Sequence, residues 1–130
     1  MAKLIHTMIR VGDLARSVAF YEQGFGLVES HRMDFPTFTL VYLREPESGY
    51  EIELTLNKGQ TEPYTHGSGY GHMAFCVADL DAHRARLQSL GYLPGDIKEL
   101  AGPAGGARFF FVTDPDGYKI EVLQRHGHYV

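Results

Sequence analysis

Hydrophobic and polar residues alternate along several short segments of the chain, as they do in strands that bury one face. In residues 4–11 the even-numbered positions include His6, Met8 and Arg10, whereas Ile5, Ile9 and Val11 are odd-numbered. In residues 51–57 the polar positions are the odd-numbered ones: Glu51, Glu53, Thr55 and Asn57. One face of each predicted strand is therefore apolar and should pack on a helix, and the other face carries His, Glu, Arg and Asn.

The chain contains this arrangement twice. His, Val, Asp and Leu recur with an offset of 66 residues between the segment that begins at His6 and the segment that begins at His72. Tyr, Ile and Glu recur with an offset of 68 residues between residues 50–54 and 118–122. Two matched segments in the same order indicate an internal repeat, in which the loops absorb the difference of two residues.

Each copy of the repeat is predicted to fold as β-α-β-β-β, which makes the protein α+β. Asp13 and Asp79 directly precede the two helical patterns and suit helix N-caps. We expect glycines to end the helices, at Gly24 and Gly26 in the first copy and at Gly91 in the second. Turns rich in Pro, Gly and acidic residues separate the last two strands of each copy, at residues 45–49 and 114–117.

These patterns divide the chain into four parts. The first β-α-β-β-β module covers residues 1–58, and the second covers residues 71–124. Residues 59–70 are rich in Gly, Thr and polar residues and form the predicted linker, and residues 125–130 form a C-terminal tail. The two tandem modules are expected to form curved mixed sheets.

The matched His and Glu residues carry the candidate chemistry. A lone His or Glu on a strand face is usually structural, but here His6 matches His72 and Glu53 matches Glu121. If the two sheets curl together, these side chains converge and offer two nitrogen and two oxygen ligands. That set suits Zn²⁺, Ni²⁺, Co²⁺ or Fe²⁺ better than Ca²⁺ or Cu⁺. The curved sheets are therefore predicted to surround one divalent metal ion, which keeps positions for substrate oxygens.

Composition excludes several kinds of partner. The formal net charge is −4 and no segment concentrates Lys or Arg, so we expect no nucleic-acid partner. No segment reaches the roughly 20 apolar residues that span a bilayer, so we expect no membrane partner. The single cysteine, Cys76, allows no disulfide within the chain. With no signal-peptide pattern at residues 1–6, the sequence predicts a soluble cytoplasmic protein.

The repeated segments resemble those of the glyoxalase I (lactoylglutathione lyase) family, in its short bacterial form, within the vicinal oxygen chelate superfamily. The resemblance covers about residues 4–124. It rests on residues 6–14, on Ser17 with residues 20–21, on residues 52–55 with Asn57, on residues 70–72 and on residues 114–121. It implies the glyoxalase/bleomycin-resistance fold. It also implies isomerisation of the hemithioacetal of methylglyoxal and glutathione to S-D-lactoylglutathione, a detoxification of methylglyoxal.

The resemblance also assigns roles to individual residues. It implies one set of metal ligands: His6, Glu53, His72 and Glu121. Glu121 is in addition the catalytic base that moves a proton from C1 to C2 of the substrate, and Arg10 and Asn57 hold glutathione, the co-substrate. The family's metal in the short forms is usually Ni²⁺ or Co²⁺, with Zn²⁺ as the alternative. A homodimer is implied, with active sites at the interface, so that the two copies sharing a metal belong to different chains.

The sequence departs from the family in the part that binds glutathione. Residues 101–108 contain no Lys, whereas the family usually carries one beside these glycines, and Arg108 is a candidate substitute. Ser68 stands where some members have an Arg.

Two alternatives remain open at this level: another enzyme of the superfamily, such as a dioxygenase or a thiol transferase, or a non-catalytic small-molecule-binding member. The former generally use two His and one Glu, and the latter lack the ligand set. The presence of Glu53 as a fourth ligand therefore favours the isomerase.

Overall fold

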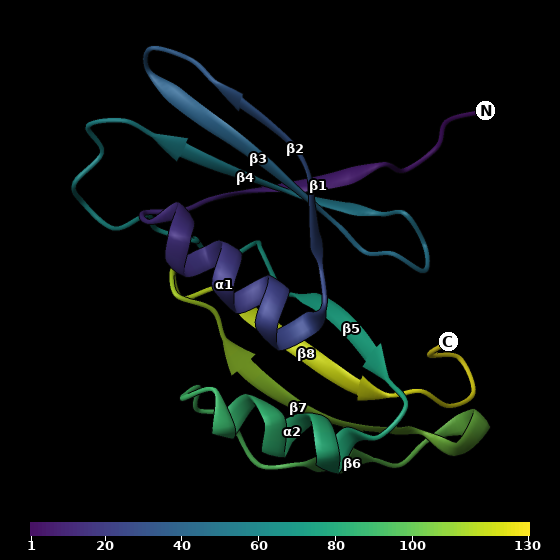
Figure 1. The fold of residues 1–130 in the computed structure, drawn as a ribbon. Helices are drawn as coiled ribbons and strands as arrows, with labels where there is room; N and C mark the ends of the chain where they lie inside the picture. Colours follow the sequence, from purple (N-terminus) through teal and green to yellow (C-terminus); the bar gives the residue numbers. More distant parts are fainter. The chain divides into compact units, whose positions relative to one another are not determined.

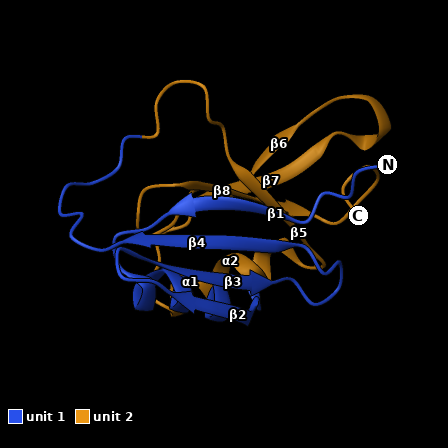
Figure 2. Cartoon of the chain, turned by 90° about the horizontal axis from the view of Figure 1, so that it is seen from above, with its two compact units in different colours: residues 1–65 blue, residues 66–130 orange.

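Two compact units make up the chain in the computed structural model, which describes all 130 residues. Unit 1 comprises residues 1–65 and unit 2 comprises residues 66–130 (Figure 2). Both contain four strands and one α-helix in the order β-α-β-β-β, and unit 2 adds a short 3₁₀ helix, Pro103–Gly105. The predicted α+β fold is confirmed.

Unit 1 is a mixed four-stranded sheet with one helix. Its strand order is β1-β4-β3-β2; β1 runs parallel to β4, and the other pairs are antiparallel (Figure 1). The elements are β1 (His6–Arg10), α1 (Leu14–Phe25), β2 (Val28–Asp34), β3 (Phe38–Arg44) and β4 (Glu51–Asn57).

Unit 2 repeats this topology. Its strand order is β5-β8-β7-β6, again with the first and last strands parallel and the other pairs antiparallel (Figure 1). The elements are β5 (Met73–Val77), α2 (Leu80–Ser89), β6 (Lys98–Leu100), β7 (Ala107–Thr113) and β8 (Lys119–Gln124). The parallel pairing places the first and last strands of each unit side by side, although about forty residues of sequence separate them.

The apolar face of each sheet packs on the helix of the same unit. In unit 1, Ile9 and Val41 both pair with Leu54 across three neighbouring strands, and all three are buried. Helix α1 packs against β3 and buries Phe20 and Tyr21 completely. Burial of side chains of this size contributes about 1.5–3 kcal/mol each, so this face is the core of the unit.

The core of unit 2 is built in the same way. Val122 pairs with Phe110 between β8 and β7, and both are buried. Helix α2 packs against β8 and buries Leu80 and Leu87 completely. In both units the polar face of the sheet, which carries the predicted ligands, therefore lies opposite the face that holds the unit together.

Both helices begin as the sequence predicts. The Asp13 carboxylate accepts a hydrogen bond from the Arg16 N–H at 3.0 Å, and the Asp79 carboxylate accepts one from the Ala82 N–H at the same distance. Each bond satisfies an N–H group that has no partner within its helix.

Two of the three predicted glycines follow the ends of their helices, and the third lies inside a helix. Gly26 caps α1 in the left-handed region, with φ 74°, and Gly91 follows α2 with φ 89°. Gly24, in contrast, is buried inside α1, so the prediction that it ends the helix is wrong. The last turn of α1 continues through Gly24 to Phe25, whose ring packs against Phe20 with a centroid distance of 5.5 Å.

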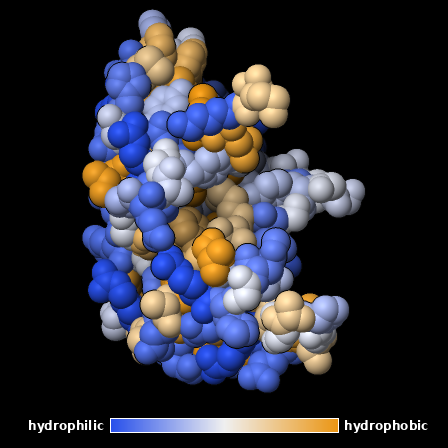
Figure 3. Space-filling model, turned by 90° about the vertical axis from the view of Figure 1, so that its right-hand side faces the viewer, coloured by the Kyte–Doolittle hydropathy of each residue, from blue (hydrophilic) through white to orange (hydrophobic).

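The surface is mixed in character. In the view of Figure 3, hydrophilic residues cover much of the face shown, with hydrophobic residues between them. Several large apolar side chains are exposed, among them Leu4, Leu93 and Leu100. Neither α-helix has the length and apolar character needed to cross a membrane.

Replacing either capping aspartate by alanine should destabilise the protein. We expect Asp13→Ala and Asp79→Ala each to lower the free energy of unfolding by about 1 kcal/mol, because each leaves a helix N–H without its partner. Urea unfolding followed by far-UV circular dichroism measures this change. Asp13→Ser is the matched control, since a serine hydroxyl accepts the same bond and should keep most of the stability. Equal losses for Asp13→Ala and Asp13→Ser would contradict the capping role.

Candidate metal centre

Unit 1 brings His6 and Glu53 together through the pairing of β1 with β4. Met8 pairs with Glu53 and His6 pairs with Glu51 in the parallel register. Because side chains alternate along a strand, His6 and Glu53 share the polar face. The His6 Nε2 atom lies 3.9 Å from Glu53 Oε2.

Unit 2 repeats the arrangement with His72 and Glu121. His72 directly precedes β5, and Ala74, two residues further on, pairs with Glu121 in β8. His72 Nε2 lies 2.8 Å from Glu121 Oε2. The two imidazole side chains are 34% (His6) and 39% (His72) exposed, so both pairs are accessible from the surface of their unit.

Tight turns before β4 and β8 set the positions of the two glutamates. In the first turn the Glu45 carboxylate accepts hydrogen bonds from two following backbone N–H groups, and Gly49 adopts φ 77°. In the second turn Oδ1 of the buried Asp114 accepts bonds from the N–H groups of Asp116 and Tyr118, both at 2.9 Å. These bonds fix where each hairpin turns, and with it the register of the strand that follows.

An aromatic ring from the third strand of each unit packs edge-on against the candidate histidine. The His6 and Tyr42 rings lie 5.7 Å apart with an interplanar angle of 77°, and the His72 and Phe111 rings lie 5.1 Å apart at 85°. Edge-to-face packing of this kind favours one orientation of each imidazole. The two units therefore hold their histidines by the same contact.

At the position that pairs with the candidate glutamate, the third strand carries a hydroxyl group in unit 1 and none in unit 2. Tyr42 pairs with Glu53 and donates a hydrogen bond from its hydroxyl to Glu53 Oε1 at 2.5 Å. Phe111 pairs with Glu121 in the same way but has no donor. The hydrogen bond to Glu53 raises the pKa of Tyr42 to about 12, with burial as a further cause, so the phenol remains a donor at neutral pH.

Sequence reasoning missed Tyr42. The signal was present, because alternation along residues 38–44 separates Val41 and Leu43 from Tyr42. Placing Tyr42 beside Glu53, however, requires the register of β3 with β4 in addition to the face.

Imidazole nitrogen and carboxylate oxygen are donor types that suit a divalent ion, and their spacing can be compared with that of ligands on one ion. Ligand bonds of about 2.1 Å place neighbouring ligand atoms about 3 Å apart in octahedral geometry and about 3.4 Å apart in tetrahedral geometry. The 2.8 Å spacing of His72 and Glu121 falls close to the octahedral value, and the 3.9 Å spacing of His6 and Glu53 is slightly wide. Neither unit gathers three or more His, Cys, Asp or Glu side chains into a metal-binding group. Each unit thus presents one pair of candidate ligands.

Arg10 and Asn57 lie where strand alternation predicts. Arg10 is two positions beyond Met8 in β1, and Asn57 is two positions beyond Thr55 in β4, on the polar face of the sheet. The Asn57 side-chain amide donates a hydrogen bond to the Tyr64 hydroxyl at 3.1 Å, which ties the end of β4 to the following segment.

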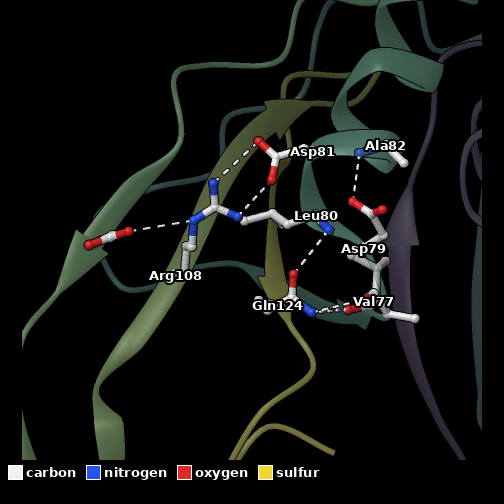
Figure 4. A network of polar contacts seen from close by, with 9 residues as sticks. Val77, Asp79, Leu80, Asp81, Ala82, Arg108 and Gln124 are labelled. Atoms are coloured by element: carbon white, nitrogen blue, oxygen red, sulfur yellow. Dashed lines mark hydrogen bonds and ion pairs between the residues drawn. The ribbon is translucent and has the colours of Figure 1, made fainter.

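Arg108 does not supply a free cation in place of the missing lysine. Its guanidinium donates two hydrogen bonds to the Asp81 carboxylate, at 2.9 and 3.2 Å, and lies 3.5 Å from Glu99 (Figure 4). A bidentate pair of this geometry directs the charge of Arg108 to α2 and β6. The Arg108 guanidinium also lowers the pKa of Asp81, chiefly through its hydrogen bonds.

A second set of bonds in the same region fixes β8 to the start of α2. The Gln124 side-chain carbonyl accepts a hydrogen bond from the Leu80 N–H at 3.1 Å, and its amide donates to the Ala78 carbonyl at 2.7 Å (Figure 4). These contacts hold the end of β5 against the end of β8, and so support the strand pair that begins directly after His72 and carries Glu121.

Comparison with known proteins shows the family to which the chain belongs. The model of the Glyoxalase/Bleomycin resistance protein/Dioxygenase superfamily matches residues 3–122. A lactoylglutathione lyase of Haemophilus influenzae is 41% identical over 128 residues, which cover 94% of this chain and 92% of the relative. The chain belongs to the glyoxalase I family. A second member, the lactoylglutathione lyase of Salmonella typhimurium, is 40% identical over 129 residues, covering 94% of this chain and 92% of that relative.

Solved structures of glyoxalase I have the same fold. The trypanothione-dependent enzyme of Leishmania major superposes with a TM-score of 0.77 at 38% identity, covering 95% of this chain and 87% of that chain. Glyoxalase I of Zea mays superposes with a TM-score of 0.79 at 33% identity, covering 95% of this chain. This chain spans 45% of the length of the maize protein. The predicted glyoxalase/bleomycin-resistance fold is confirmed.

Replacing Arg108 by glutamine should raise the pKa of Asp81 toward its ordinary value. A carboxyl group whose folded-state pKa is lowered contributes stability above its unfolded-state pKa and loses it as the pH falls through the lowered value. Titration of the Asp81 carboxyl carbon by NMR, in wild type and in Arg108→Gln, measures the change. Asp34 is the internal control, because Lys58 in unit 1 lowers its pKa and the substitution leaves that pair intact. An unchanged Asp81 titration would show that the pair does not form in solution.

Proposed function

We propose that this chain is a metal-dependent lactoylglutathione lyase that isomerises the hemithioacetal of methylglyoxal and glutathione to S-D-lactoylglutathione. The observation that carries the proposal is the pair of matched donor sets, His6 with Glu53 and His72 with Glu121. The 41% identity to the lactoylglutathione lyase of Haemophilus influenzae supports the assignment of the reaction. The cellular role is removal of methylglyoxal.

The four side chains are proposed to complete one metal site by dimerisation. One His–Glu pair fills only two positions of an ion that takes four to six ligands. In the proposed homodimer, His6 and Glu53 of one chain share the ion with the second pair contributed by the other chain. We propose Ni²⁺ or Co²⁺ as the metal, with Zn²⁺ as the alternative.

Glu121 is proposed as the base. When bound, the ion supplies Lewis-acid polarisation of the substrate oxygens. Glu121 takes the proton from C1 of the hemithioacetal and returns it to C2, so that the C1–H bond breaks and a C2–H bond forms. At the same time the C1 hydroxyl loses its proton and the C2 oxygen gains one, which leaves atoms and electrons balanced. Glu121 suits this role better than Glu53, since its neighbour Phe111 has no hydroxyl to bind the carboxylate.

Arg10 and Asn57 are proposed to hold the thiol part of the substrate. Arg10 would pair with a carboxylate of glutathione, since a guanidinium binds carboxylates by two parallel hydrogen bonds. Asn57 lies at the end of the strand that carries Glu53, where its amide is already oriented by Tyr64. Both residues share the polar face with the metal ligands of unit 1.

Metal reconstitution tests the reaction and the metal together. After removal of metals with a chelator, we expect glutathione and methylglyoxal to give no thioester, and addition of Ni²⁺ or Co²⁺ to restore its formation more fully than Zn²⁺. Ultraviolet absorbance of the thioester measures the rate. Trypanothione in place of glutathione provides a parallel arm, because the Leishmania major enzyme is trypanothione-dependent. Failure of every metal with both thiols would contradict the proposed function.

Glu121→Gln should separate catalysis from metal binding. The amide still offers an oxygen ligand but cannot accept the proton, so we expect kcat to fall by about 10²- to 10⁴-fold while metal affinity falls only in part. Steady-state kinetics and metal titration of the same preparation measure both. Glu62→Gln is the control, because Glu62 lies outside the strands and both His–Glu pairs. Activity that survives in Glu121→Gln would assign the base to another residue.

A further inference from the structure

We propose that Tyr42 is a positioning residue that holds Glu53 as the fixed carboxylate ligand, whereas Phe111 leaves Glu121 free to leave its ligand position and act as the base. The inference rests on the proposed function and deepens it, since it explains how two matched glutamates come to have unequal roles. It concerns a hydroxyl group present in one copy of the repeat and absent from the other.

The geometry of the Glu53 carboxylate separates its two oxygen atoms. Oε1 accepts the hydrogen bond from the Tyr42 hydroxyl at 2.5 Å, and Oε2 faces His6 Nε2 at 3.9 Å. A carboxylate held at one oxygen presents the other in a defined direction. Glu53 is therefore oriented to bind a metal ion through Oε2 alone, beside His6.

The internal repeat provides a control for the packing role of the ring. Tyr42 and Phe111 occupy matched positions: each pairs with the candidate glutamate and each packs edge-on against the candidate histidine. The ring of Phe111 packs against its histidine without a hydroxyl group. The hydroxyl of Tyr42 is therefore not needed for this packing, and the hydrogen bond to Glu53 is the contact that it adds.

Neighbouring rings restrain the direction of the Tyr42 side chain. His31 pairs with Tyr42 across β2 and β3, and their ring centroids lie 6.0 Å apart. The His6 ring also packs edge-on against Tyr42, with a centroid distance of 5.7 Å. Contacts with two imidazoles restrain the Tyr42 ring while its hydroxyl is directed at Glu53, as an outer-shell hydrogen bond to a metal ligand requires.

Glu121 lies in a different environment. Its Oε2 contacts His72 at 2.8 Å, and the residue that faces it from β7 is apolar. Rotation of the Glu121 carboxylate toward C1 of the substrate would break its contact with His72 but no bond to a neighbouring phenol. For Glu53 the same rotation would break the bond to Tyr42.

Tyr42→Phe tests the positioning role by a readout that needs no turnover. We expect the affinity of the metal-free protein for Ni²⁺ or Co²⁺, measured by competition with a chromophoric chelator, to fall by about 10- to 100-fold. The visible absorption spectrum of the Co²⁺ form should also change, because the orientation of one ligand changes. Tyr50→Phe is the matched control: it removes a phenol hydroxyl of the same unit, bonded to Thr7, and should leave the affinity and the spectrum unchanged.

Phe111→Tyr tests the other half of the inference. A hydroxyl group placed opposite Glu121 should bind its carboxylate, so we expect metal affinity to be kept or increased and kcat to fall by about tenfold or more. Equal affinity of wild type and Tyr42→Phe, or equal losses in Tyr42→Phe and Tyr50→Phe, would overturn the role of Tyr42. An unchanged kcat in Phe111→Tyr would overturn the freedom assigned to Glu121. If wild type binds no metal, the proposed metal site fails and the inference with it.

Discussion

The parallel pairing of the first strand with the last strand in each unit is the constraint on which the candidate site depends. It brings His6 beside Glu53, and His72 beside Glu121, across about fifty residues of sequence. Because side chains alternate with a period of two, a slip of one residue would turn each glutamate into the apolar core. The bonds that Asp114 forms within its turn therefore support the chemistry of the site as well as the shape of the hairpin.

The two units share the same sheet topology and apolar core face, and they differ in the side chains on the polar face of the sheet. The apolar face carries matched residues, such as Ile52 with Ile120 and Leu54 with Val122, because both sheets must pack on a helix. The polar face is less constrained by packing and has diverged, as Tyr42 with Phe111 shows. The core of each unit lies on the opposite side of its sheet. A change on the polar face can therefore alter the site with little effect on the fold.

Features encoded by nearby residues could be predicted from the sequence. Alternation placed His6, Glu53 and Glu121 on polar strand faces, and His72 lies directly before β5. Asp13 and Asp79 cap their helices as expected. Gly24 was misjudged because glycine alone does not fix where a helix ends: α1 continues to Phe25, and Gly26 adopts the left-handed conformation of its cap.

Contacts between segments that lie far apart in the sequence could not be predicted from local sequence patterns. Arg108 was a candidate substrate cation until the structure showed its carboxylate partners on α2 and β6. Tyr42 became visible only with the strand register. The meeting of the two His–Glu pairs stays a prediction, because two ligands in each unit do not by themselves define a metal centre.

The division of the ligands between two units has a physical consequence for the proposed site. Each pair already forms a contact within its own unit: His72 Nε2 lies 2.8 Å from Glu121 Oε2, and His6 Nε2 lies 3.9 Å from Glu53 Oε2. The buried apolar core of each unit contains none of these four side chains. In the proposed dimer the ion would bind the assembled state more tightly than the separate chains, and so stabilise the assembly by mass action. In the proposed dimer, metal binding and dimerisation are therefore thermodynamically coupled. The coupling depends on the strand pairing within each unit, because that pairing forms the two His–Glu pairs.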